Sequence, residues 1–288
     1  MKNGVSQSTK CLALFRKHNM RDKAGLWGVC DGALSAASAI PISLARRVLY
    51  ALGLFVAASA AFYGVFASVA YPWNWSGVWK YRFQFGNGWL MTMGLSLVAM
   101  VVSIGFGFVL MLGRRAPWEP VRMACGGVVE LVRGSPLLVQ LLIGHYIIAQ
   151  SLSIEQPVVT GIILLGCFEG AYLAEIFRGA VESISASQLE AARAVGFGKV
   201  QTYRFVIIPQ ALRRALPGTT GQLVSLIKDS SLLSVIGIEE LVQKVKIMNS
   251  ASYAPLEGYL PLVAAYLIVT LPLSYVARRL EGRFAYET

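Results

Sequence analysis

Apolar residues occur in long runs along this chain, and polar residues collect between the runs. A helix that crosses the hydrocarbon core of a membrane needs roughly 20 mostly apolar residues, and six segments come near that length. The third of them is short, and the fifth is polar for a span. The six segments are Val48–Ala70, Trp89–Gly113, Pro136–Leu152, Val158–Val181, Thr219–Ile238 and Tyr259–Ala277. The pattern therefore predicts an all-α polytopic membrane protein with about six transmembrane helices.

Composition and charge support a membrane location and predict its orientation. Of the 288 residues, 56% are hydrophobic and 14% charged, which is too apolar for an ordinary soluble domain. The net charge of +11 is concentrated at the ends of the apolar runs, and no basic patch interleaved with aromatic residues indicates nucleic-acid binding. With six crossings, 21 of the 26 Lys and Arg residues lie on the side of both termini. The positive-inside rule then predicts that both termini are cytoplasmic.

The chain is expected to have three parts. Residues 1–47 form a basic cytoplasmic tail with eight Lys or Arg residues, residues 48–70 an extra transmembrane helix, and residues 88–280 the main transmembrane domain. The tail could contact anionic lipid headgroups or simply be disordered. The four cysteines lack the spacing of a disulfide framework or of a zinc site, so neither is predicted.

A polar segment at about 183–217 is predicted to form two short cytoplasmic helices. Ser187 with Glu190, or Ser185 with Gln188, gives a capping-box pattern for the start of the first helix. Gly196 is suited to end that helix as a C-cap. The alternative interpretation is a well-capped surface loop without a further role.

The second helix of this segment is predicted at 199–207, and Pro209 is expected to stop it. In the first helix, Ala191 and Ala192 carry little bulk, so another surface could approach closely there. The chain has no GxxxxGK[ST] phosphate loop. If the protein is driven by ATP, the ATPase must therefore be another polypeptide.

These residues carry a resemblance to a known family. The segment is similar to the EAA loop of ABC-importer permeases, whose pattern is EAA, three residues, Gly, nine residues, Ile, one residue, Leu-Pro. This chain has Glu190-Ala191-Ala192, Gly196, Val206, Ile208 and Pro209 at the matching positions, with Val206 and Ile208 as conservative departures. The segments 130–140, 170–179 and 225–232 also resemble the polar amino acid branch of that family. The resemblance covers about residues 88–280, in order, and leaves the tail and the first helix outside it.

The resemblance implies the permease of a type I importer, with an extra helix before its core. It implies two permease subunits, identical or related, around a translocation path. It further implies two cytoplasmic ATPases that dock on the EAA loops and an extracytoplasmic binding protein that delivers a polar amino acid. ATP and Mg²⁺ would bind the ATPase, and this chain would carry no cofactor and no catalytic site. The expected location is the bacterial inner membrane.

Charged side chains inside the spans are the candidates for the translocation path. A charge at the bilayer centre costs about 2.5–3.5 kcal/mol on insertion scales, so each one needs a reason. Glu169 lies in the fourth span, and Lys228, Asp229, Ser230 and Ser231 lie in the fifth. A zwitterionic amino acid needs a cationic and an anionic partner, which these residues could supply. The Glu169 carboxylate would favour a cationic substrate, although a purely structural role is the alternative.

Two other functional classes deserve comparison. An ion-coupled secondary transporter could use Glu169 and Lys228–Asp229 as a coupling site, but such folds usually have more spans and internal repeats, and no clear repeat is present. An intramembrane enzyme is disfavoured because the spans lack HExxH, GxSxG and paired-aspartate patterns. Dependence of uptake on ATP or on an ion gradient separates the first two classes.

Overall fold

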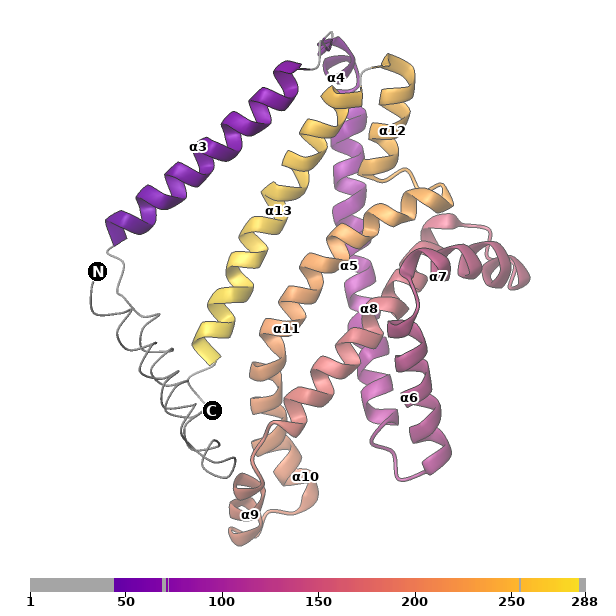
Figure 1. Ribbon diagram of the computed structural model, residues 1–288. Helices are drawn as coiled ribbons and strands as arrows, with labels where there is room; N and C mark the ends of the chain where they lie inside the picture. Colours follow the sequence, from indigo (N-terminus) through magenta and orange to yellow (C-terminus); the bar gives the residue numbers. More distant parts are fainter. Residues whose placement is uncertain (1–43, 69–70, 72, 254, 285–288) are drawn as a thin grey trace, which may run out of the picture. The chain divides into compact units, whose positions relative to one another are not determined.

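The computed structural model describes residues 44–68, 71, 73–253 and 255–284, and all regular structure among them is helical (Figure 1). This confirms the predicted all-α class. The predicted tail, 1–47, lies outside the described residues except for its last four positions, which begin a helix. The elements are α3 (Leu44–Ser68), α4 (Ser76–Lys80), α5 (Arg82–Gly113), α6 (Glu119–Gly134), α7 (Leu137–Ile143), η1 (Gly144–Ala149), α8 (Pro157–Glu182), α9 (Ala186–Ala194), α10 (Lys199–Thr202), η2 (Tyr203–Ile207), α11 (Ile208–Asp229), η3 (Ser230–Ile236), α12 (Leu241–Ser252) and α13 (Pro255–Phe284).

The chain divides into two compact units, residues 1–72 and 73–288. The first contains α3, a helix of 25 residues rich in Ala, Leu and Phe, at the position where residues 48–70 were expected to be helical. The second unit contains the remaining helices and every candidate functional residue. It is the unit described below.

Three crossings can be assigned in the second unit, or up to five if each of two bent helix pairs is one span. The helices α5, α8 and α13 are long and apolar enough to span a membrane. Two bent pairs pass the same test: α6 with α7 and η1, bent by 109°, and the helical run from Lys199 to Ile236 with α12, bent by 51°. Among the described residues of α3, the apolar helix Leu52–Gly64 is shorter than a span, so length and composition support up to five of the six predicted crossings.

One predicted boundary agrees with the structure and one differs. The helix of the third predicted span begins at Pro136 as expected, because Pro136 is the N-cap residue of α7 and lies at the bend after α6. The fifth does not begin at Thr219, because α11 begins at Ile208. The first turns of α11 are amphipathic and contain Arg213 and Arg214, so a search for apolar runs misses them. Residues 208–217 are therefore helix, and the segment between α8 and α11 is shorter than predicted.

The central contact of this unit is a close crossing of α5 and α8. A Cβ atom added at Gly107 on α5 would lie 2.7 Å from the carbonyl oxygen of Gly170 on α8. A Cβ atom at Gly170 would lie 3.0 Å from the carbonyl oxygen of Ser103. Small residues let two helix backbones approach in this way, and Gly166 with Gly170 forms a GxxxG spacing. The crossing fixes the face of α8 on which Glu169 lies.

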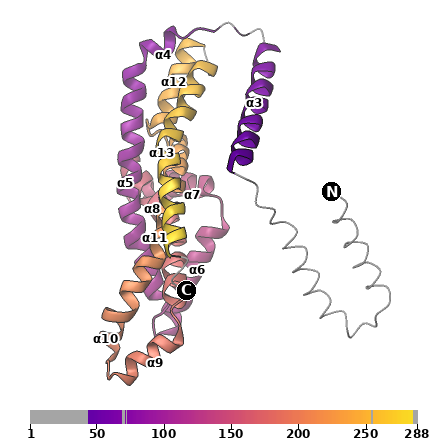
Figure 2. The same ribbon diagram turned by 90° about the vertical axis from the view of Figure 1, so that its left-hand side faces the viewer.

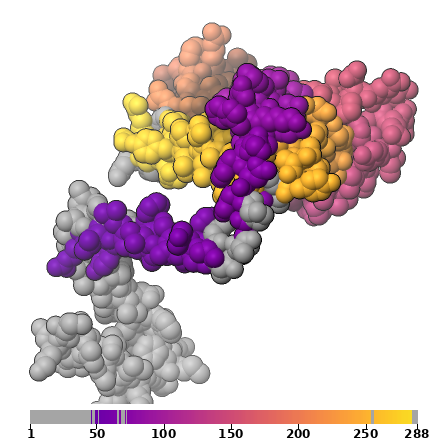
Figure 3. Space-filling model, turned by 90° about the horizontal axis from the view of Figure 1, so that it is seen from above, coloured from indigo at the N-terminus to yellow at the C-terminus, as the bar shows by residue number. Residues whose placement is uncertain are grey.

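The two ends of the unit carry different elements. Figures 1 and 2 show α9 and α10 at one end and α4 and α12 at the other. Viewed along the bundle, α4 and the start of α5 lie beside α12 (Figure 3). Lys80 and Arg82 thus share an end with Lys244 and Lys246, as the predicted topology requires. The Arg114-Arg115 pair that ends α5 is at the opposite end, with α9 and α10.

Candidate functional site

The segment between α8 and α11, residues 183–207, is called the α8–α11 loop here. Its first helix, α9, begins after Ser185, whose backbone is extended with φ −65° and ψ 145°. Neither predicted capping box forms in α9. The Ser185 hydroxyl lies 3.0 Å from the Ser187 hydroxyl instead of accepting a backbone N–H, and Gln188 accepts a hydrogen bond from Gln210 of α11 at 2.5 Å. The Gln188 side chain is therefore used to join α9 to α11.

Gly196 ends α9 as predicted. Its φ of +88° lies in the left-handed region, which glycine adopts without the strain that other L-residues incur. The Phe197 N–H donates to the carbonyl oxygen of Ala192 at 3.0 Å, and the Gly196 N–H donates to that of Arg193 at 2.9 Å. These two bonds form a Schellman motif. The sharp turn after α9 therefore depends on a glycine at this position.

Pro209 does not stop a helix, contrary to the prediction. It lies in the first turn of α11, directly after the π-helical turn η2 (Tyr203–Ile207). In that turn the Ile208 N–H donates to the carbonyl oxygen of Tyr203, five residues back. The wider turn accommodates a proline that would otherwise clash inside an α-helix. The run from Lys199 to Ile236 is consequently one continuous helical path.

The EAA residues divide between two faces of α9. Glu190 and Ala191 are exposed, whereas Ala192 is buried against the rest of the loop. The Glu190 carboxylate makes no hydrogen bond or ion pair with another described residue, so the predicted capping role is wrong. Arg214 on α11 donates to the Ser183 hydroxyl at 2.8 Å. This contact joins α11 to the residue that caps α8, whereas the Gln188–Gln210 bond attaches α9 to α11.

A cluster of ion pairs joins three helices next to the α8–α11 loop. Glu175 on α8 pairs with Arg178 at 2.7 Å, as its i,i+3 spacing predicts. It also pairs with Arg114 at the end of α5 and lies 3.7 Å from Arg133 on α6. The Arg133 guanidinium in turn lies 5.1 Å from the Tyr172 ring centre. The Glu175 carboxylate, with three cationic neighbours, thus connects α5, α6 and α8. The contacts with α5 and α6 could not be predicted from the sequence, because they depend on how the helices pack.

Only some of the residues that were predicted to line the translocation path lie near one another. Glu169 is fully buried at the contact of α8 with α11. One of its carboxylate oxygens accepts a hydrogen bond from Gln222 of α11, and the other has no hydrogen-bond partner. Asp229, at the end of α11, is within electrostatic reach of Glu169. The sequence analysis did not select Gln222. A polar glutamine inside a predicted span could have been selected on the same ground as the charged residues there.

The other three residues of the set lie on different faces. Lys228 is exposed and points away from Glu169's side of the helix, whereas Ser231 is half-buried. Ser230 is fully buried and donates to the carbonyl oxygen of Ile227 at 2.7 Å. The side chains of Lys228 and Asp229 thus lie on different faces of the helix, because neighbouring helix positions are about 100° apart. Asp229 alone of this group is brought near Glu169.

Sequence comparisons place this arrangement among known proteins. Residues 111–286, more than half of the chain, match the family described as "Binding-protein-dependent transport system inner membrane component". The glutamine transport system permease protein GlnP of Escherichia coli K12 is 34% identical over 214 residues, covering 73% of this chain and 97% of that protein. The arginine ABC transporter permease protein ArtQ of the same organism is 29% identical over 217 residues, covering 67% and 91%.

A solved structure agrees with these relatives. It is described as the crystal structure of an amino acid ABC transporter with histidines, and it matches with a TM-score of 0.69 and 30% identity. The match covers 74% of this chain and all of the other. The resemblance to ABC-importer permeases is confirmed by both comparisons. The chain belongs to the family of inner membrane components of binding-protein-dependent transport systems.

Proposed function

We propose that this chain is the transmembrane permease subunit of an ATP-driven importer for a polar amino acid. The observation that carries the proposal is the α8–α11 loop. It presents Glu190 and Ala191 on an exposed helix that a left-handed Gly196 terminates. The exposed face of α9 is thus a compact surface on which another protein can dock, and the chain that carries it belongs to a transport family. Relatives named for glutamine and arginine transport support the substrate class.

The partner that docks there is proposed to be a cytoplasmic ATPase. Ala191 carries only a methyl group, so an ATPase cleft can approach the α9 backbone closely, while Ala192 faces inward and supports the helix. ATP and Mg²⁺ bind the ATPase, and hydrolysis is its activity. A second permease subunit and an extracytoplasmic binding protein complete the proposed importer. Both termini, and the α8–α11 loop, are then cytoplasmic in a bacterial inner membrane, in accord with the basic residues at that end.

The connections of α9 give the coupling a physical route. A displacement of α9 by the ATPase is transmitted to α11 through the bond between Gln188 and Gln210. The contact between Arg214 and Ser183 couples the same part of α11 to the end of α8. Because the helical path from Lys199 to Ile236 is continuous, α11 can carry the movement toward Asp229. ATP would thereby favour one of two packings of the bundle, as alternating access requires.

The path itself is proposed to pass the α8–α11 contact that contains Glu169. Two carboxyl groups, those of Glu169 and Asp229, lie near each other there, and one Glu169 oxygen has no partner. A cationic group of the substrate would satisfy both. We therefore expect Glu169→Gln to reduce uptake of a cationic amino acid such as arginine more than uptake of glutamine. Equal effects on both substrates would remove Glu169 from the path.

The docking proposal is tested by ATP-dependent uptake in vesicles containing the chain, its ATPase and its binding protein. Ala191→Arg should reduce uptake strongly at equal amounts of inserted protein, because it adds bulk and charge to the docking face. Ala186→Arg is the matched control, since position 186 is also exposed on α9 but lies about 140° around the helix. Normal uptake by Ala191→Arg would contradict docking. Uptake driven by an ion gradient without ATP would favour the secondary-transporter alternative.

A further inference from the structure

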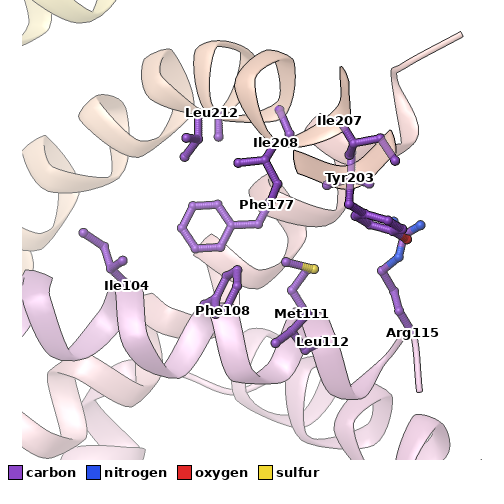
Figure 4. A pocket seen from close by; sticks show the side chains of 13 residues that line it. Ile104, Phe108, Met111, Leu112, Arg115, Phe177, Tyr203, Ile207, Ile208 and Leu212 are labelled. Atoms are coloured by element: carbon purple, nitrogen blue, oxygen red, sulfur yellow. The ribbon is translucent and has the colours of Figure 1, made fainter. Parts of the chain in front are cut away.

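An apolar groove lies beside the α8–α11 loop. It holds about 330 Å³, and Figure 4 shows the side chains that line it. One wall is α5 from Ile104 to Arg115, another is α8 at Phe177 and Val181, and the third runs from Tyr203 of η2 along α11. Apart from Arg115 and the Tyr203 hydroxyl, its lining side chains are all apolar. Phe108 on α5 and Leu212 on α11 are at least half exposed, so the groove is open to an occupant.

The length of the groove matches one leaflet of a bilayer. From Ile104 to Gly113, the last residue of α5, there are nine residue steps, which at 1.5 Å per residue rise about 14 Å. The hydrocarbon core of a membrane is about 30 Å thick, so one leaflet is about 15 Å. Arg115 follows the last turn of α5. With the orientation given in the proposed function, Arg115 lies at the headgroup level of the cytoplasmic leaflet, and the apolar wall extends from there to about the middle of the membrane.

Charge at the mouth of the groove indicates which occupant fits. Arg115 is exposed, and its guanidinium takes part in no hydrogen bond or ion pair with another described residue. The neighbouring Arg114 is different, because it is paired with Glu175. A free guanidinium above an apolar channel of leaflet length complements a phosphate that carries an acyl chain. A helix of another protein would fill the apolar channel, but it would need an acidic residue opposite Arg115 to pair with this charge.

We propose that the groove binds an anionic phospholipid of the cytoplasmic leaflet, with the phosphate on Arg115 and an acyl chain between α5 and α11. The inference uses the orientation given in the proposed function but needs neither the ATPase nor the substrate. Because Tyr203 and Ile207 of η2 line the groove, the chain would pack against the turn that links the α8–α11 loop to α11.

Lipid retention tests the proposal directly. The full chain is reconstituted in vesicles of equal parts phosphatidylglycerol and phosphatidylcholine and extracted in mild detergent, and its retained lipids are quantified by mass spectrometry. Attraction of one basic residue to an anionic headgroup corresponds to about a fivefold preference, so phosphatidylglycerol should be enriched about fivefold. Arg115→Gln should abolish the enrichment. Arg122→Gln, at the same end but paired with Glu119, should preserve it.

A second pair of variants tests the acyl-chain site. Ala211→Phe fills the groove from α11 and should lower retention of both lipids, whereas Ala264→Phe, at an exposed alanine of α13, should not. Equal retention of the two lipids, or unchanged enrichment in Arg115→Gln, would overturn the proposal. So would efficient crosslinking of Leu212→Cys to a second permease, which would assign the groove to a protein interface. Retained lipid is measured without transport, so this result is independent of whether the proposed function holds.

Discussion

Gly196→Ala tests whether the left-handed turn after α9 is needed for transport. Gly196 has φ +88°, and a Cβ atom added there would meet no other atom within 4 Å. The substitution thus introduces backbone strain without a steric clash. A left-handed conformation costs a non-glycine residue about 1–2 kcal/mol, and the two Schellman bonds depend on that conformation. The backbone strain therefore destabilises the end of α9 and not the helix bundle.

This strain is large compared with the stability of a short exposed helix. A change of 1–2 kcal/mol alters an equilibrium between ordered and open states by a factor of about 5–30, and segments with few buried contacts open at low free energy. In α9, Ala192 is the buried residue. We therefore expect ATP-dependent uptake to fall several-fold at equal amounts of inserted protein, with little change in the unfolding temperature of the bundle.

The neighbouring glycine supplies the control. Gly198 has φ −70°, which alanine adopts without strain, so Gly198→Ala should transport normally. Gly196→Asn should give intermediate uptake, because asparagine tolerates the left-handed region better than alanine. Uptake is measured in vesicles that contain the complete importer. Normal uptake by Gly196→Ala, or an equal loss in Gly198→Ala, would refute the reasoning.

Three further substitutions probe the loop, the ion-pair cluster and the helix crossing. Gly196→Asp should abolish uptake while the protein still inserts, which fractionation of membranes can verify; full uptake would argue against docking at this turn. Glu175→Gln should lower the free energy of unfolding by about 2–3 kcal/mol, because it leaves Arg114 and Arg133 without their carboxylate partner. Glu182→Gln, which removes a single exposed pair, should cost less than about 1 kcal/mol in the same denaturation assay; equal losses would show that the cluster has no special role. Gly107→Val should lower the unfolding temperature in detergent, since its side chain would meet the α8 backbone, whereas Gly105→Val, which faces open space, should not; similar unfolding temperatures would contradict the close crossing.

Much of the fold could be predicted because hydrophobic length and glycine conformation are local properties. The apolar runs locate α5, α8 and α13, and the position of Gly196 predicts the end of α9. The amphipathic first turns of α11 were missed because Arg213 and Arg214 interrupt the apolar pattern there. Pro209 was misinterpreted because a proline is normally a stop signal, and the π-helical turn that accommodates it has no sequence signature in a single chain.

The candidate site was less predictable because it depends on which helices meet. The pairing of Glu175 with Arg178 follows from i,i+3 spacing, but its contact with Arg114 requires the crossing of α5 and α8. The Gly166–Gly170 spacing was an available signal for that crossing. Likewise, Asp229 and Lys228 are neighbours in sequence, and only the packing of α11 on α8 places the carboxylate of Asp229 near Glu169.

The most direct test of the account is purification of this chain from its native membrane in mild detergent, with mass spectrometry of the proteins that accompany it. We predict a stoichiometric soluble partner that carries a GxxxxGK[ST] loop, and its loss from the complex when Ala191 is replaced by arginine. Recovery of the wild-type chain without such a partner, in a state that still supports ion-driven uptake after reconstitution, would contradict the proposal that a separate ATPase drives it.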